Sequence, residues 1–96
     1  MNKKEIQHII VSYLRNYSPE YVGIFGSFAR GENTDNSDID ILVRFHNNLS
    51  LLQLINIENE LSNKLGVKVD LITAGSLKND RVRKSIHNDL KIIYTL

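Results

Sequence analysis

The segment DIDILV, from Asp38 to Val43, constrains the fold of this chain more than any other stretch. Its branched apolar residues are typical of a buried strand, yet two aspartates stand among them. Because side chains alternate across a strand, Asp38 and Asp40 share one face while the isoleucines beside them point into the core. Burial of an unpaired carboxylate costs on the order of several kcal/mol. Either a cation therefore compensates these charges, or the strand does not lie where the apolar pattern places it.

Composition predicts one soluble domain spanning residues 1–96. With 42% hydrophobic and 24% charged residues, the chain has the balance of an ordinary globular domain, and 96 residues suffice for one core. A formal charge of +1 argues against a strongly cationic nucleic-acid binder, so we expect no direct nucleic-acid binding. The sequence lacks cysteine, a secretory signal and an apolar run of membrane-spanning length. We expect a cytoplasmic protein without membrane association.

Apolar spacing and capping signals predict the order of the elements. We expect helices over residues 2–17, 50–65 and 81–88, and strands over 21–25, 38–44 and 67–72. Residues 26–37 form a loop with room for one helical turn, and residues 91–94 fit either a strand or a helix end. This order predicts an α/β fold, a small sheet with helices packed on one or both of its faces.

A third carboxylate joins the first two if the strand over residues 67–72 pairs with the strand over 38–44. Alternation then places Asp70 on the face opposite Val69, which is the face that carries Asp38 and Asp40. The Cα atoms of Asp38 and Asp40 would lie roughly 6.5 Å apart, close enough for both side chains to reach one ion. Ligands that are all oxygen suit Mg²⁺ or Mn²⁺. The carboxylates therefore predict a divalent metal site.

The loop before the acids has the features of a phosphate site. Gly26 and Ser27 follow an apolar strand directly, and a helical turn starting there would point backbone N–H groups outward. Arg30, one turn further, could add guanidinium donors for phosphate oxygens. Other nucleotide and metal motifs fail: Glu32 stands where a Walker A loop needs lysine, and the glycine pattern of dinucleotide sites and the spacing of an EF-hand are absent.

The surviving pattern resembles that of the minimal nucleotidyltransferases, which belong to the superfamily related to DNA polymerase β. Their GSxxRG...SDxD motif is matched residue for residue, and Asp70 lies where a third acid is expected. The matching positions are Gly26, Ser27, Arg30, Gly31, Ser37, Asp38 and Asp40. The motif covers residues 25–43, and the order of strands extends the resemblance over nearly the whole chain. It implies a small mixed β-sheet flanked by helices, the polymerase β-like palm fold.

The resemblance also implies a reaction and roles for these residues. Asp38, Asp40 and Asp70 are expected to be catalytic and to bind one or two Mg²⁺ ions, or Mn²⁺, with Asp70 placed to take the acceptor proton. Gly26 and Ser27 would hold the phosphates of ATP. Arg30 and Ser37 would rather orient the loop and the neighbouring acids.

A substrate and a partner follow from the same resemblance. Relatives look like antitoxins of two-gene modules whose toxin is a HEPN-domain ribonuclease, so we expect AMP transfer from ATP to a tyrosine hydroxyl of such a toxin. We expect the protein to form a hetero-oligomer with the toxin, and adenylylation would neutralise the toxin. Two alternatives stay open. One is a catalytically silent antitoxin that neutralises its partner by binding alone, and the other is a nucleotidyltransferase acting on a small molecule.

Overall fold

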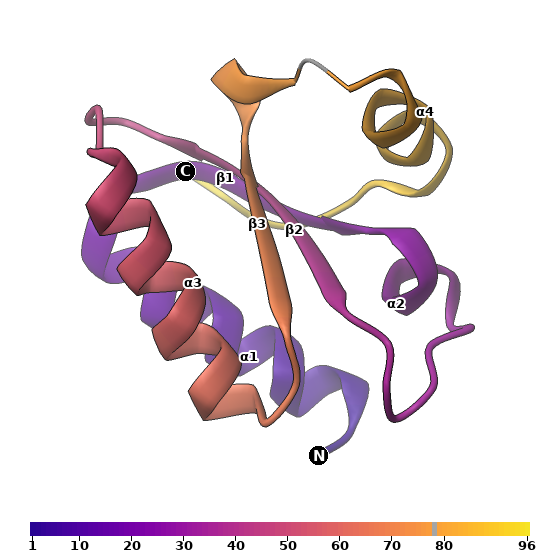
Figure 1. Cartoon of the computed structure of the whole chain (residues 1–96). Coiled ribbons are helices and arrows are strands. Elements are labelled where there is room, and N and C mark those ends of the chain that lie inside the picture. The colour runs from indigo at the N-terminus through magenta and orange to yellow at the C-terminus, as the bar shows by residue number, and fades with distance from the viewer. Residues whose placement is uncertain (78) are drawn as a thin grey trace.

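The structure is a computed structural model that describes residues 1–77 and 79–96 (Figure 1). Its helices are α1 (Lys3–Leu14), α2 (Gly26–Arg30), α3 (Leu51–Leu65) and α4 (Asp80–Asp89), with short 3₁₀ segments η1 (Arg15–Tyr17) and η2 (Ala74–Ser76). Its strands are β1 (Pro19–Phe25), β2 (Ile39–Phe45), β3 (Val69–Thr73) and β4 (Lys91–Thr95). The order of elements agrees with the predicted one, and the stretch after α4, whose type was open, is a strand.

The strands of the described residues form one four-stranded mixed sheet with the spatial order β3-β2-β1-β4. β1 runs antiparallel to both β2 and β4, whereas β2 and β3 run parallel and are connected through α3. A helical crossover of this kind is the usual connection between neighbouring parallel strands. The predicted α/β fold with a small mixed sheet is confirmed. The pairing of β2 with β3, on which the placement of Asp70 depends, is confirmed as well.

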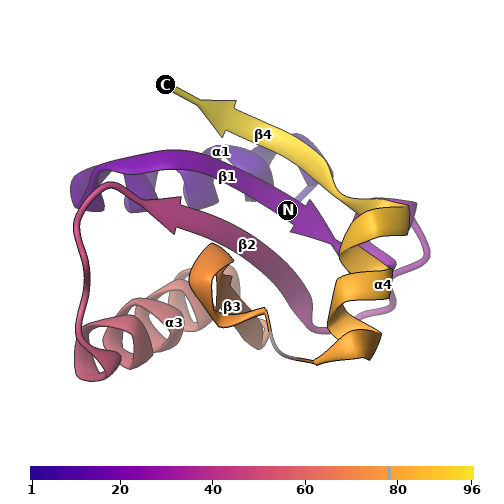
Figure 2. The same cartoon turned by 90° about the horizontal axis from the view of Figure 1, so that it is seen from above.

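Helices cover both faces of this sheet. α1 and α3 pack side by side on one face, and α4 lies on the opposite face at one end of the sheet, next to α2 (Figures 1 and 2). The hydrophobic core lies between the sheet and the pair α1 and α3. Ile39, Ile41 and Val43 of β2 all point into this core and are 3% exposed or less. By alternation, Asp40 of β2, and Asp38 just before it, therefore lie on the face that α4 partly covers.

Local sequence signals explain where the helices begin and end. Asn2 caps α1 by accepting a hydrogen bond from the Glu5 backbone N–H at 2.8 Å. Ser50 and Gln53 form a reciprocal capping box at the start of α3. α3 ends at Gly66, whose φ of +71° is the left-handed conformation that glycine adopts without strain. These signals were predicted from the sequence.

The strand boundaries differ from the predicted ones by one or two residues. β1 begins at Pro19 rather than Tyr21, because proline is tolerated as the first residue of a strand, where its missing N–H breaks no ladder. β3 begins at Val69 rather than Val67. The preceding Lys68 nevertheless joins the ladder, since its carbonyl oxygen accepts a hydrogen bond from the Ile39 N–H at 2.9 Å.

Candidate active site

Two aspartates lie directly opposite each other on the parallel strands β2 and β3. Asp40 of β2 is the register partner of Asp70 of β3. Like charges at directly opposite positions of neighbouring strands are destabilising. The pair therefore has no explanation in stability alone, and a bound cation would turn the repulsion into a shared attraction.

The surroundings of Asp40 disfavour its negative charge. Burial raises the pKa of the Asp40 carboxyl from 3.8 to about 6, with contributions from the neighbouring Asp70 and Asp38 carboxylates and an opposing one from Arg30. Nearby positive charge favours the ionised form of a carboxyl group. A cation beside Asp40 would therefore lower this pKa again. Perturbed carboxyl groups of this kind are frequent at functional sites.

Gly26 starts α2 immediately beside the Asp40 carboxylate. Its φ is +75°, and a Cβ atom placed on it would overlap with Oδ2 of Asp40. Both the backbone conformation and the close approach thus require glycine at this position. The turn between β1 and α2 and the acidic strand β2 are therefore in direct contact, as a site joining phosphate and metal requires.

Asp38 lies just before β2 and is matched by a lysine just before β3. The Nζ atom of Lys68 is 3.8 Å from Asp38 Oδ2 and 3.6 Å from Asp70 Oδ1. Lys68 therefore bridges two of the three predicted metal ligands. The sequence interpretation missed this residue, although alternation with the apolar Val67 and Val69 would have placed it on the acidic face.

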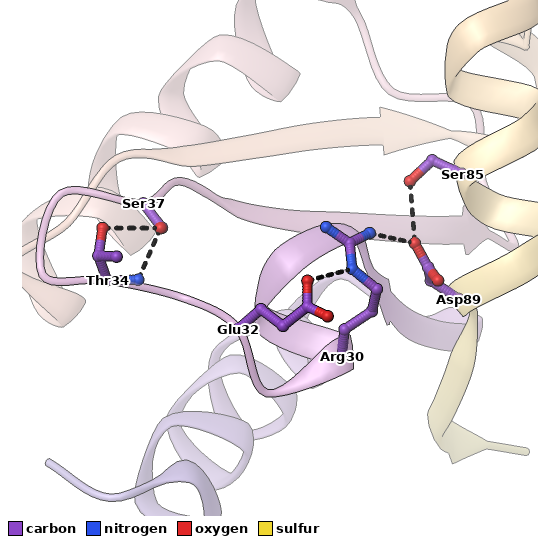
Figure 3. A network of polar contacts seen from close by, with 6 residues as sticks. All are labelled: Arg30, Glu32, Thr34, Ser37, Ser85 and Asp89. Carbon is purple, nitrogen blue, oxygen red and sulfur yellow. Dashed lines mark hydrogen bonds and ion pairs between the residues drawn. The ribbon is translucent and has the colours of Figure 1, made fainter.

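Arg30 is turned toward α4 and is engaged by two carboxylates (Figure 3). Its Nη1 donates to Asp89 Oδ2 at 2.6 Å, and its Nε donates to Glu32 Oε2 at 3.0 Å. Asp89 is partly buried, with 11% of its side chain exposed, and also accepts a weaker contact from Ser85 at 3.4 Å. The structure thus places Arg30 as a link between α2 and α4. No local signal predicts this link, because Asp89 lies 59 residues further along the chain.

Ser37 closes the turn that leads into Asp38 (Figure 3). Its Oγ accepts a hydrogen bond from the Thr34 N–H at 2.8 Å and lies 3.1 Å from the Thr34 hydroxyl. A serine that binds its own turn orients the backbone of that turn. Ser27, by contrast, stands in the first turn of α2, next to Gly26.

The donor set fits a hard divalent cation, but the side chains are not gathered around one point. In the described parts of the chain, no group of three or more histidine, aspartate or glutamate side chains is arranged to hold a metal ion as it stands. The three aspartates nevertheless offer only oxygen ligands on one face of two adjacent strands, which is the chemistry Mg²⁺ prefers. Asp38 is 41% exposed, and its side chain can turn toward Asp40 once its 3.8 Å contact with Lys68 is exchanged. The residues therefore fit the ion in kind, and binding requires a local rearrangement.

Comparison with known proteins agrees with this fold. The family model described as polymerase beta, nucleotidyltransferase, matches residues 7–96. A relative from Methanocaldococcus jannaschii, whose name places it among protein adenylyltransferases, is 47% identical over 90 residues, which cover 90% of this chain and 92% of that protein. None of the described helices combines the length and apolar character needed to cross a membrane.

Solved structures share the fold. A chain from a crystal structure of a toxin–antitoxin complex with AMP-PNP has a TM-score of 0.82 at 24% identity, over 94% of this chain and 73% of that one. A second comes from a complex of tri-AMPylated HEPN toxin with MNT antitoxin from Shewanella oneidensis. It has a TM-score of 0.79 at 20% identity, over 99% of this chain and 74% of that one.

The fold and the family match together define a nucleotidyltransferase domain. The chain belongs to the polymerase beta nucleotidyltransferase family, and the predicted resemblance to minimal nucleotidyltransferases is confirmed.

Proposed function

We propose that this protein is an antitoxin that transfers AMP from ATP to a tyrosine hydroxyl of a HEPN-domain partner, and thereby neutralises that partner. The observation that carries the proposal is the opposed pair Asp40 and Asp70, an arrangement that costs stability unless a cation is bound. The names of the relative and of the neighbouring structures support the substrate and the partner.

In the proposed reaction, the tyrosine oxygen attacks the α-phosphorus of ATP. The bond from that phosphorus to the bridging oxygen breaks, and pyrophosphate leaves with its electron pair. Asp38, Asp40 and Asp70 would hold one or two Mg²⁺ ions, or Mn²⁺ in their place. Such an ion, when bound, neutralises the triphosphate and stabilises charge on the entering and leaving oxygens.

The other site residues bind and orient. Asp70 accepts the proton of the attacking hydroxyl, because it stands on β3 at the side of the pair away from the β1–α2 turn. Gly26 and the N–H groups near Ser27 receive the outer phosphates. Arg30 and Ser37 hold α2 and the Asp38 turn in place rather than contacting phosphate. Their bonds to Asp89 and to the Thr34 N–H support this role.

Transfer of labelled AMP tests this proposal. The protein is incubated with a candidate HEPN-domain partner, Mg²⁺ and α-labelled ATP, and the partner is then analysed by mass spectrometry. We expect AMP on a tyrosine with the wild-type protein and none with the Asp38→Asn/Asp40→Asn variant. Asp35→Asn, in the exposed loop before Ser37, is the matched control and should keep full transfer.

Neutralisation by binding alone is the second candidate function. It is favoured by one observation, namely that the described acidic side chains are not arranged to hold a metal as they stand. In that case the Asp38→Asn/Asp40→Asn variant would protect cells from the partner as well as the wild type does, and no AMP would be found on the partner. Loss of both transfer and protection in this variant would exclude binding alone.

A further inference from the structure

Lys68 is held on the acidic face by the architecture of β3. The two neighbours of Lys68 in the sequence both face the core: Val69 is fully buried, and Val67 packs against the core. Because side chains alternate along an extended chain, Lys68 must point the same way as Asp70, away from the core. The hydrogen bond from the Ile39 N–H to the Lys68 carbonyl fixes this backbone against β2. The lysine therefore cannot leave this face without disrupting the sheet.

The register creates two rows of charged side chains across β2 and β3. Asp40 and Asp70 form a row of like charge. Two residues earlier on each chain segment, just before the strands begin, Asp38 and Lys68 form a row of opposite charge, and Lys68 Nζ lies 3.8 Å from Asp38 Oδ2. Lys68 also reaches diagonally to Asp70, at 3.6 Å. Its single positive charge is thus shared by two carboxylates that come from different strands.

The contacts of Lys68 are loose enough to be exchanged. Its side chain is 69% exposed, and both distances lie near the outer limit of an ion pair. Exposed ion pairs contribute little stability because water and salt screen them. A divalent cation carries twice the charge and binds carboxylate oxygens directly at about 2.1 Å. It would displace the ammonium group from both acids.

We propose that Lys68 is a displaceable counter-cation, which holds Asp38 and Asp70 in the metal-free protein and competes with the divalent ion for them. This inference rests on the proposed function, since it takes these aspartates as metal ligands. Lys68 acts through the ligands and is a positioning residue. It limits the repulsion between the strands before the metal nucleotide arrives, and it sets the metal concentration at which the site fills.

Mn²⁺ binding to the full chain, without nucleotide or partner, tests the role of Lys68. Free Mn²⁺ is followed by electron paramagnetic resonance at low ionic strength for the wild type and for Lys68→Met. Removal of the competing charge should tighten the dissociation constant by about fivefold, and salt should shrink the difference. Lys68→Arg, which keeps the charge, should bind as the wild type does. Lys91→Met, an exposed lysine at the start of β4, should also leave binding unchanged.

Thermal unfolding without metal gives a second readout that does not depend on binding or activity. Lys68→Met should lower the melting temperature of the metal-free protein more than Lys91→Met does. Addition of Mn²⁺ should then raise the melting temperature of Lys68→Met by more than it raises that of the wild type. Unchanged or weaker Mn²⁺ binding in Lys68→Met would overturn the inference. If Asp40→Asn still abolishes Mn²⁺ binding in that case, the proposed function stands without it. A wild-type protein that binds no Mn²⁺ would overturn both.

Discussion

At the scale of single residues, the Asp40 carboxyl group has the least favourable surroundings for its charge. Its pKa is raised from 3.8 to about 6, so the folded protein binds this proton more tightly than the unfolded chain does. Stability from this group is complete below pH 3.8 and is lost as the pH rises through 6. At neutral pH the charge on Asp40 therefore destabilises the metal-free protein.

Asp40→Asn should consequently stabilise the metal-free protein at pH 7.5. We expect the free energy of unfolding to rise by about 1–2 kcal/mol, a figure reduced from the full shift because the group is partly exposed. At pH 4 the difference from the wild type should vanish. Urea unfolding with EDTA at both pH values measures this difference in the free energy of unfolding, with Asp35→Asn as the control. A destabilised Asp40→Asn variant at pH 7.5 would contradict the assigned environment.

Substitutions at Gly26 and Gly31 distinguish the effect of backbone strain from the effect of crowding at the site. Both have φ near +75°, but among the described residues a Cβ on Gly31 meets no atom within 4 Å, whereas one on Gly26 overlaps with Asp40 Oδ2. Gly31→Ala should therefore cost about 1 kcal/mol of stability and keep AMP transfer. Gly26→Ala should cost more and also abolish transfer, because Asp40 must move. Urea unfolding and the transfer assay compare the two variants, and equal activity in both would argue against a role for the Gly26 contact.

At the scale of elements, β3 is an edge strand whose outer side is covered by α3. The Ser62 hydroxyl accepts a hydrogen bond from the Val69 N–H at 2.9 Å, and Glu58 Oε2 accepts one from the Leu71 N–H at 2.8 Å. The two amides that flank Asp70 are thereby satisfied by side chains of one helix. This contact protects the edge and fixes the strand that carries the third acid.

Ser62→Ala should destabilise the protein by about 1–2 kcal/mol, because it leaves the Val69 N–H without its partner at a partly buried position. Ser12→Ala, an exposed serine of α1, is the matched control and should change stability by less than about 0.5 kcal/mol. Denaturant unfolding of both variants provides the comparison. Equal stabilities would show that α3 does not hold β3 through this bond.

At the scale of the whole molecule, the site joins segments that are distant in sequence, and this decides what could be predicted. Alternation placed Asp38, Asp40 and Asp70, because Ile39, Ile41 and Val43 of β2 and Val69 of β3 are apolar and buried. The starts of α1 and α3 could be predicted because their capping residues lie within a few positions of the helix start. The pairing of β2 with β3 remained conditional until the structure showed it, because register is a tertiary property.

Other features could not be read from local patterns. The link between Arg30 and Asp89 depends on how α4 lies across the sheet, which no periodicity encodes. The motif suggested Arg30 as a phosphate ligand or a loop-orienting residue, and its contacts with Asp89 and Glu32 agree with the second role. The position of the Lys68 ammonium group between Asp38 and Asp70 is likewise a matter of side-chain conformation.

The proposed reaction requires that Asp40 and Asp70 share a divalent cation with Asp38 on one face of the sheet. A crystal grown with Mn²⁺ and AMP-PNP tests it most directly through the anomalous difference density of the metal. We predict a peak about 2.1 Å from carboxylate oxygens of Asp40 and at least one other of these aspartates, with the Lys68 ammonium group displaced. Bound nucleotide with no anomalous peak at these carboxylates would contradict the account.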